Sequence, residues 1–167
     1  MREQRDVALA ALTTLRLGGT ARSLVEVATE EELVAAVRAV DAEGEPALVL
    51  GGGSNVVVAD DGFNGTVVLV RTRGVDVDSE ACSGATVTVA AGEEWDPLVA
   101  RAVREQWVGV EALSGIPGLA GAVPIQNVGA YGQEVAQTIA SVRTYDRVER
   151  RIATFAAQDC GFAYRNS

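Results

Sequence analysis

The sequence predicts an α+β fold of two lobes that meet near residue 71, and three observations support this prediction. Residues 23–50 contain a strand pattern, a helix pattern and a second strand pattern in succession. From about residue 71 onward, apolar and polar residues alternate, which is typical of antiparallel hairpins. The length of 167 residues is that of one domain. We therefore expect a single domain with lobe one at about 1–70 and lobe two at about 71–167.

Lobe one is predicted to contain a strand, a helix and two further strands. β-branched residues indicate a strand over 23–28. A Thr-Glu-Glu-Glu capping box, apolar residues at helical spacing and a closing glycine indicate a helix over 29–44. Residues 47–50 are entirely apolar, which predicts a buried strand that a helical crossover places parallel to the first. The last strand predicted for this lobe covers 66–70.

Lobe two is predicted to contain two hairpins with a helix between them. The first hairpin pairs 74–78 with 86–90, and the second pairs 141–146 with 150–155. The helix is expected to have Asp96 as its cap, with Pro97 in its first turn, and to end at Gly109. Its expected buried face consists of Leu98, Val99, Ala102 and Val103.

The charged residues exclude several kinds of chemistry. The chain has 14 cationic and 23 acidic residues, every cation is Arg, and His is absent. Without Lys there is no Walker A loop and no Schiff-base lysine. Without His there is no Ser-His-Asp triad and no HExxH zinc site, and we expect no metal centre. A net charge of −9 also disfavours a nucleic-acid partner.

The cysteines and the apolar segments predict a cytoplasmic protein. Cys82 and Cys160 form no CxxC pair and are expected to be free thiols, with a disulfide or a reactive thiol as alternatives. No apolar signal region follows Met1. Residues 112–133 carry no charge, but their prolines and glycines would leave backbone groups unsatisfied in lipid. We therefore expect no membrane contact, while the oligomeric state is not indicated.

Two glycine-rich segments are the candidates for a binding site. Residues 51–55 read Gly-Gly-Gly-Ser-Asn, and their uncovered amides could converge on a pyrophosphate. They lack the Rossmann fingerprint, and a simple tight turn is the alternative. Residues 114–132 are too apolar for a solvated loop, and they carry the amide side chains of Gln126 and Asn127. A flat apolar ligand with an anionic tail would fit both segments, and a buried connecting loop is the alternative for the second.

Four motifs strongly resemble the UDP-N-acetylenolpyruvoylglucosamine reductases, the flavin-dependent reductases of peptidoglycan precursor synthesis. They are Gly-Gly-Gly-Ser-Asn (51–55), Gly-Ile-Pro-Gly (115–118), Pro-Ile-Gln-Asn-Val-Gly-Ala-Tyr-Gly (124–132) and the terminal Tyr-Arg-Asn-Ser (164–167). The resemblance implies the two-lobed FAD-binding fold of the p-cresol methylhydroxylase and vanillyl-alcohol oxidase type. It also implies non-covalent FAD, NADPH as the hydride source, and a small nucleotide-sugar substrate, UDP-N-acetylglucosamine enolpyruvate. Covalent attachment of the flavin through a cysteine is an alternative known from the wider fold.

The resemblance also implies roles for individual residues. The expected cofactor-binding residues are Gly51, Gly52, Gly53, Ser54, Asn55, Ser114, Gly115, Ile116, Pro117, Gly118, Gly121, Ala122, Val123, Gly129 and Ala130. The expected substrate-binding residues are Tyr164, Tyr131, Gln126 and Asn127. Arg165 is the expected catalytic residue, because a fixed forked cation can hold a carboxylate and stabilise the charge that develops after hydride addition. Without the motif, Arg165 would be interpreted as a solvated terminal cation.

One departure from the family bears on catalysis. In the family, a second, substrate-binding domain follows the Tyr-Arg motif and supplies a proton-donating serine and an assisting glutamate. Neither residue is assigned here, and Ser167 is not assigned the serine's role. We therefore expect this chain to be the FAD-binding part, with little or no complete turnover. The alternatives are the flavin-binding part of another oxidoreductase of this fold, and a non-catalytic nucleotide-binding module.

Overall fold

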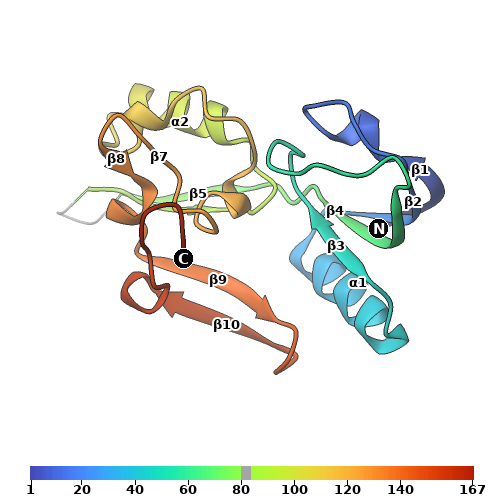
Figure 1. Ribbon diagram of the computed structural model, residues 1–167. Helices are drawn as coiled ribbons and strands as arrows, with labels where there is room; N and C mark the ends of the chain where they lie inside the picture. The colour runs from blue at the N-terminus through green and yellow to red at the C-terminus, as the bar shows by residue number, and fades with distance from the viewer. Residues whose placement is uncertain (80–83) are drawn as a thin grey trace. The chain divides into compact units, whose positions relative to one another are not determined.

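The computed structural model describes residues 1–79 and 84–167 and divides into two compact units (Figure 1). Unit 1 comprises Met1–Thr72 with Arg147–Arg150, and unit 2 comprises Arg73–Asp146 with Arg151–Ser167. Cys82 lies outside the described residues. Cys160 is a free thiol, as predicted, and its Sγ donates to the carbonyl of Ala156 at 3.4 Å.

Unit 1 is built on a four-stranded sheet in the order β1-β2-β4-β3. Its strands are β1 (Arg2–Ala8), β2 (Thr20–Val27), β3 (Ala47–Leu50) and β4 (Phe63–Val70). β2 and β3 both run parallel to β4, and β1 runs antiparallel to β2. The predicted parallel strand-helix-strand unit is therefore confirmed, with β4 inserted between its two strands.

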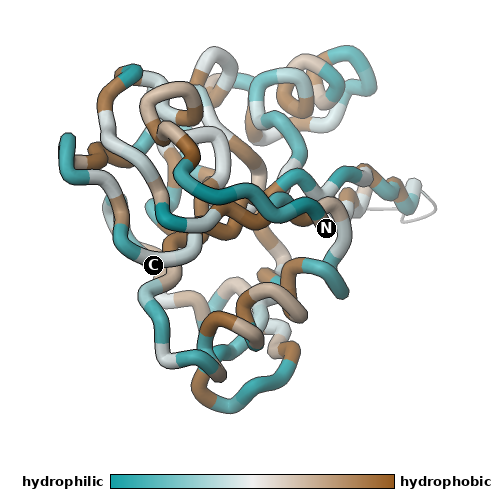
Figure 2. The backbone as a smooth tube through the Cα atoms, turned by 90° about the vertical axis from the view of Figure 1, so that its right-hand side faces the viewer, coloured by the Kyte–Doolittle hydropathy of each residue, from teal (hydrophilic) through white to brown (hydrophobic). Residues whose placement is uncertain are grey.

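The helix that connects β2 to β3 is α1 (Glu30–Glu43), and its ends follow the predicted capping. The Thr29 hydroxyl accepts from the Glu32 amide at 3.2 Å, and the Glu32 carboxylate accepts from the Ala28 amide at 2.8 Å. Gly44 ends the helix in the left-handed conformation at φ 67°, where glycine is favoured. Hydrophobic and hydrophilic residues alternate along α1 (Figure 2), because one face of the helix packs on the sheet.

The core of unit 1 lies along β4, which is buried from Gly65 to Val70. The buried cluster consists of Leu9, Ala21, Leu24, Leu50, Val67 and Leu69. The prediction that 47–50 form a buried strand is wrong in part: β3 is an edge strand, and Val49 is 51% exposed. β1 was not predicted, because it is an edge strand in which polar residues predominate and which therefore carries little apolar pattern.

Both predicted hairpins are present in unit 2. β5 (Val75–Asp78) pairs antiparallel with β6 (Thr86–Val89), and β9 (Ser141–Asp146) pairs antiparallel with β10 (Arg151–Ala156). In the first hairpin, exposed and half-buried residues alternate along both β5 and β6, as the sequence pattern predicts.

The helix of unit 2, α2 (Trp95–Arg104), differs from the prediction at both ends. Its N-cap is Glu94 rather than Asp96, because the buried Trp95 already lies in the first turn and its indole donates to the Leu113 carbonyl at 3.1 Å. Pro97 does occupy the first turn, as predicted. The helix ends at Arg104, before Gly109, and Val103 is 56% exposed rather than buried.

The uncharged segment 112–133 forms no α-helix. It contains the end of a 3-10 turn at Glu111–Leu113, a second such turn at Ala120–Ala122, and β7 (Gly129–Ala130), which pairs with β8 (Gln133–Glu134). Apolar side chains of this segment belong to the core of unit 2, whose buried members are Trp95, Val99, Leu113, Val123, Val128 and Val135. None of the helices in the described ranges is long and apolar enough to span a membrane.

Candidate functional site

The loop of residues 51–55, the first candidate segment, follows β3 directly in unit 1. Gly53 adopts φ 69°, and a Cβ at this position would lie 1.9 Å from the Leu12 carbonyl oxygen. The Gly53 carbonyl accepts from the Thr14 amide at 3.0 Å. The loop thus packs against the backbone of residues 12–14, and only glycine has both the conformational freedom and the size for this contact.

Backbone donors remain available in this loop. Among the described residues, no hydrogen-bond acceptor is found for the amides of Gly52 or Gly53. Gly53 is buried, and buried amides in native proteins nearly always have a partner. Adjacent free amides in a glycine loop form a concave group of donors that suits an anion such as a diphosphate.

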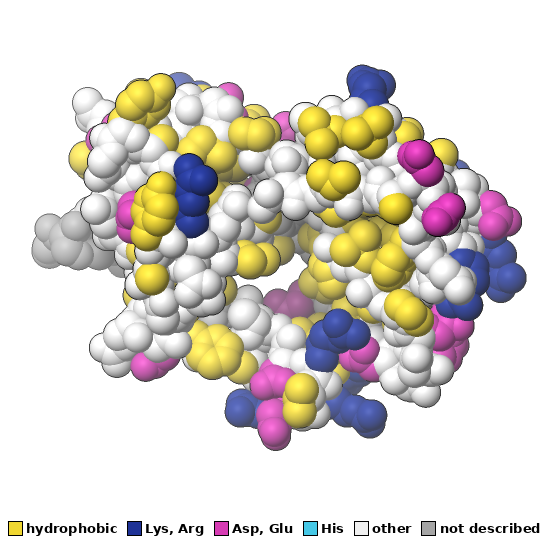
Figure 3. All heavy atoms as spheres, in the orientation of Figure 1, with side chains coloured by type: hydrophobic (Ala, Val, Ile, Leu, Met, Phe, Trp, Pro, Cys, Tyr) yellow, Lys and Arg dark blue, Asp and Glu magenta, His cyan; other side chains and the backbone are white. Residues whose placement is uncertain are grey.

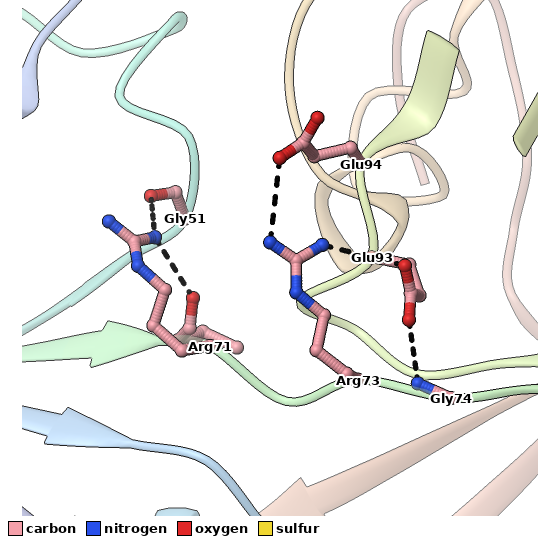
Figure 4. A network of polar contacts seen from close by, with 7 residues as sticks. Gly51, Arg71, Arg73, Gly74, Glu93 and Glu94 are labelled. Atoms are coloured by element: carbon pink, nitrogen blue, oxygen red, sulfur yellow. Dashed lines mark hydrogen bonds and ion pairs between the residues drawn. The ribbon is translucent and has the colours of Figure 1, made fainter. Parts of the chain in front are cut away.

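Arg71 lies beside this loop and was not identified in the sequence analysis. Its Nη1 donates to the Val70 carbonyl at 3.2 Å and to the Gly51 carbonyl at 3.5 Å (Figure 4). The topology explains the proximity: Leu50 of β3 is paired with Leu69 of β4, so the residues that follow these parallel strands meet at one edge. Ligands of open parallel sheets bind at the carboxyl ends of strands, and this rule could have identified Arg71.

The second candidate segment lies in unit 2, and its first two residues, 114 and 115, are hydrogen-bonded to Asp96. Asp96 Oδ1 accepts from the Gly115 amide at 2.6 Å and from the Ser114 hydroxyl at 3.0 Å. These two donors, the Gly115 amide first, lower the pKa of the Asp96 carboxyl below its ordinary value. The carboxylate expected to cap α2 therefore tethers a loop distant in sequence.

Residues 118–121 of the same segment run along residues 91–95. The Trp95 amide donates to the Gly118 carbonyl at 3.1 Å, and the Gly121 amide donates to the Ala91 carbonyl at 2.9 Å. A Cβ on Gly121 would lie 2.6 Å from the Ala91 Cβ. Backbone hydrogen bonds and close packing thus hold this part of the segment in place.

Asn127 connects three parts of unit 2. It is 2% exposed, its Nδ2 donates to Glu134 Oε2 at 2.8 Å and to the Ala163 carbonyl at 3.0 Å, and its Oδ1 accepts from the Ala136 amide at 3.1 Å. The side-chain amide is thus engaged by the protein itself on both its oxygen and its nitrogen. The structure gives Asn127 a structural role that the sequence did not predict, and its predicted substrate contact stays a prediction.

The Tyr-Arg motif forms a tight turn next to this network. The Ala163 amide donates to the Asn166 carbonyl at 2.9 Å, and the Asn166 amide donates to the Ala163 carbonyl at 3.1 Å. The Arg165 guanidinium lies over the Tyr164 ring, 5.5 Å from its centroid. Asn127 therefore fixes, through Ala163, the turn that carries Tyr164 and Arg165.

Three predicted site residues have the left-handed backbone conformation that non-glycine residues seldom adopt. The φ angles are 43° at Asn127, 51° at Tyr131 and 53° at Arg165. Such conformations are found preferentially at functional sites. Tyr131 and Tyr164 are also 97% and 79% exposed. Hydrophobic side chains reach the surface of unit 2 in Figure 3.

The structure thus distributes the predicted residues between the two units. Gly51–Asn55 belong to unit 1, and the other predicted site residues belong to unit 2. Val123 is buried in the core of unit 2, and Ile116 packs against that core. Ser114, Pro117, Ala122 and Gly129 are exposed.

Comparison with known proteins identifies the family. The FAD binding domain model FAD_binding_4 matches residues 21–150. The chain is 59% identical over 162 residues to the UDP-N-acetylenolpyruvoylglucosamine reductase of Cutibacterium acnes, an alignment that covers 97% of this chain and 43% of that protein. The chain therefore spans less than half the length of this curated relative.

Solved structures agree with this result. The UDP-N-acetylenolpyruvylglucosamine reductase (MurB) of Thermus caldophilus matches with a TM-score of 0.78 and 34% identity, covering 100% of this chain and 57% of that one. A VAO-type flavoprotein from Myceliophthora thermophila matches in fold, with a TM-score of 0.62 and 16% identity over 80% of this chain and 26% of that one. These comparisons confirm three predictions: the α+β FAD-binding fold, the resemblance to the reductases, and FAD as the cofactor. The chain belongs to the FAD binding domain family.

Proposed function

We propose that this chain is the FAD-binding part of a UDP-N-acetylenolpyruvoylglucosamine reductase. As part of that enzyme it would serve the NADPH-linked reduction of UDP-N-acetylglucosamine enolpyruvate to UDP-N-acetylmuramate in the cytoplasm. The observation that carries the proposal is the 59% identity to a reductase of that name, over 97% of this chain. All the predicted motifs lie within the aligned length of its Streptomyces coelicolor relative, which covers 100% of this chain at 50% identity.

The residues present fit the cofactor. The amides of Gly52 and Gly53 have no acceptor in the described part of the chain, and an anionic diphosphate would supply one. The segment from Ser114 to Val123 offers exposed small residues beside an apolar core, which suits a flat ring and its polar tail. When bound, FAD would supply the means of carrying hydride from NADPH to the enolpyruvyl double bond.

The roles proposed for the Tyr-Arg turn follow from charge and placement. Arg165 carries a permanent positive charge and a planar fork of donors, so it can hold a substrate carboxylate and stabilise negative charge that develops beside it. The Tyr164 ring under the guanidinium restricts its orientation. Asn127 holds this turn through its hydrogen bond to the Ala163 carbonyl. In this proposal, Tyr131 and Gln126 belong to the substrate-binding segment next to Asn127.

The chain is proposed to lack part of the catalytic machinery. It spans 43% of its Cutibacterium acnes relative, and no proton donor for the product is assigned among its residues. We therefore expect the chain to hold flavin while completing little or no turnover by itself.

The test is a titration of the purified, cofactor-free chain with FAD, followed by visible absorption and flavin fluorescence. Saturable perturbation of the flavin spectrum is expected. NADPH and the enolpyruvyl substrate are then added to the loaded protein, and formation of UDP-N-acetylmuramate is measured. A chain that takes up no FAD would contradict the proposed function, and turnover at the rate of a full-length reductase would contradict the proposed incompleteness.

A further inference from the structure

Arg71 has no carboxylate partner recorded in the described residues, unlike Arg22, Arg73 and Arg147. The chain has a net charge of −9, and ion pairs are found for Arg22 with Glu45 and for Arg147 with Asp41. The Nη1 group of Arg71 instead donates to two backbone carbonyls, those of Val70 and Gly51. Its positive charge is therefore not compensated by a neighbouring side chain.

Arg73, which is close to Arg71 in sequence, does have carboxylate partners. Its Nη1 lies 3.4 Å from Glu93 Oε2, and its Nη2 lies 3.5 Å from Glu94 Oε1 (Figure 4). Glu93 also accepts from the Gly74 amide at 2.7 Å. The charge of Arg73 is thus used within the protein, and this residue is half exposed at the surface.

Arg71 retains donors for a ligand. The Nη1 contacts fix the guanidinium beside the loop of residues 51–55, and the residue is half-buried. For Nε and Nη2 of Arg71 no acceptor is found within the described residues. A guanidinium has five N–H donors in a rigid fork, and two adjacent nitrogens match two oxygens of a phosphate group.

These donors belong to the same unit as the free amides of the loop. Gly51 follows β3 and Arg71 follows β4, and the two strands are hydrogen-bonded neighbours. The amides of Gly52 and Gly53 come directly after the carbonyl that Arg71 holds. One cation and two neutral donors therefore occur at one edge of the sheet of unit 1.

We propose that the Arg71 guanidinium and the amides of Gly52 and Gly53 form one anion-binding site, which takes the diphosphate of a dinucleotide. The inference rests on the proposed function, which supplies the dinucleotide, and adds to it the residue that neutralises the diphosphate charge. The Nη1 contact with the Gly51 carbonyl places the guanidinium beside the loop, where Nε and Nη2 would donate to the phosphate oxygens. Arg73 has no part in the site.

The test compares Arg71→Met with Arg73→Met as the matched control, since both remove one charge and keep an unbranched stem. The dissociation constant for FAD is measured by flavin fluorescence at low and high salt, and ADP is used as a competitor that carries the diphosphate without the flavin. Arg71→Met is expected to weaken FAD and ADP binding about 10- to 100-fold, the size of a lost charge-assisted hydrogen bond. It should also reduce the salt dependence of FAD binding. Arg73→Met should change both constants less than about twofold.

Two further measurements distinguish a loss of phosphate binding from poor folding of a variant. Arg71→Lys keeps the charge without the fork, so it should bind FAD with an intermediate affinity and with salt dependence retained, even if Arg71→Met folds poorly. Riboflavin lacks the phosphates, and its affinity should be the same in wild type and in the Arg71 variants. If the wild type binds FAD and both arginine variants bind it equally well, the inference about Arg71 is wrong while the proposed function stands. If the wild type binds neither FAD nor ADP, both are wrong.

Discussion

The two candidate cofactor segments are both rich in glycine, yet the structure holds them in different ways. In the loop of residues 51–55, Gly53 packs so closely on the backbone that a Cβ would lie 1.9 Å from the Leu12 carbonyl oxygen. In the second segment, Gly115 has a similar positive φ of 78°, but nothing lies within 4 Å of where its Cβ would be. The second loop is held instead by a carboxylate, since Asp96 accepts from both Ser114 and Gly115.

This difference teaches that the same residue type serves two physical purposes. At Gly53 the absence of a side chain is required by space and by conformation together. At Gly115 it is required by conformation alone, and polar side chains elsewhere in unit 2 determine where the loop lies. Substitutions in the two segments should therefore have costs that differ in size and in pH dependence.

The largest effect is expected for Gly53→Ala. The free energy of unfolding should fall by about 2–5 kcal/mol, because the left-handed backbone costs about 1–2 kcal/mol for alanine and the overlap with Leu12 adds about 1–3 kcal/mol. Gly44→Ala is the matched control, since Gly44 has φ 67° and nothing within 4 Å. Gly44→Ala should lower the free energy of unfolding only by the cost of the left-handed backbone, about 1–2 kcal/mol.

Denaturant unfolding followed by circular dichroism measures both variants of unit 1. Equal losses for Gly53→Ala and Gly44→Ala would show that the close approach to Leu12 carries no energetic weight. FAD binding by Gly53→Ala should also weaken, because relief of the overlap moves the amides of the loop.

The next effect is expected for Asn127→Asp in unit 2. The new carboxylate would replace the Nδ2 donor 2.8 Å from Glu134 Oε2 and 3.0 Å from the Ala163 carbonyl. A buried hydrogen bond would become a repulsive contact, at a cost of about 2 kcal/mol in the free energy of unfolding.

Thermal unfolding of Asn127→Asp and wild type checks this prediction. Gln158→Glu adds the same charge at an exposed position and is the control for net charge. A loss of stability in Asn127→Asp no larger than that of this control would show that the Asn127 Nδ2 contacts add nothing to the stability of unit 2.

The part of the fold that sequence predicted is the part governed by local pattern. The cap at Thr29, the helix end at Gly44 and the alternating hairpins depend on neighbours within a few residues, and the structure has them. The edge position of β3 depends on where β4 inserts, which is a property of the whole sheet. Asp96 was misread as a cap because its partners, Ser114 and Gly115, are far away in sequence.

The candidate site divides in the same manner. Its glycine loops and the Tyr-Arg motif are continuous in sequence and could be identified there. The contacts of Asn127 could not, because Glu134, Ala136 and Ala163 meet it only after folding. Arg71 is intermediate, since the adjacency of its strand and the glycine loop follows from parallel pairing once the strand order is known.

A smaller effect is expected for Gly115→Ala. Because the space beside Gly115 is open, the cost should be the conformational one, about 1–2 kcal/mol. Gly115→Asn should cost less, since asparagine tolerates the left-handed region better than alanine does. The midpoint of thermal unfolding should move by about 2–4 °C for each kcal/mol in a chain of this size. A loss for Gly115→Ala as large as that for Gly53→Ala would remove the distinction between the two segments.

The smallest effect is expected at Asp96, and it should depend on pH. The Gly115 amide and the Ser114 hydroxyl lower the pKa of this carboxyl from its ordinary value of 3.8 in the folded protein. A lowered folded-state pKa means that the charged form adds stability above the unfolded-state value, and that this stability is lost as the pH falls through the folded-state value. Wild type should therefore exceed Asp96→Asn in stability most clearly above about pH 5, and the two should converge below the ordinary pKa. Ser114→Ala removes one of the two donors and should reduce this pH dependence, whereas unfolding curves that stay parallel at every pH would show that the Asp96 charge does not hold the second segment.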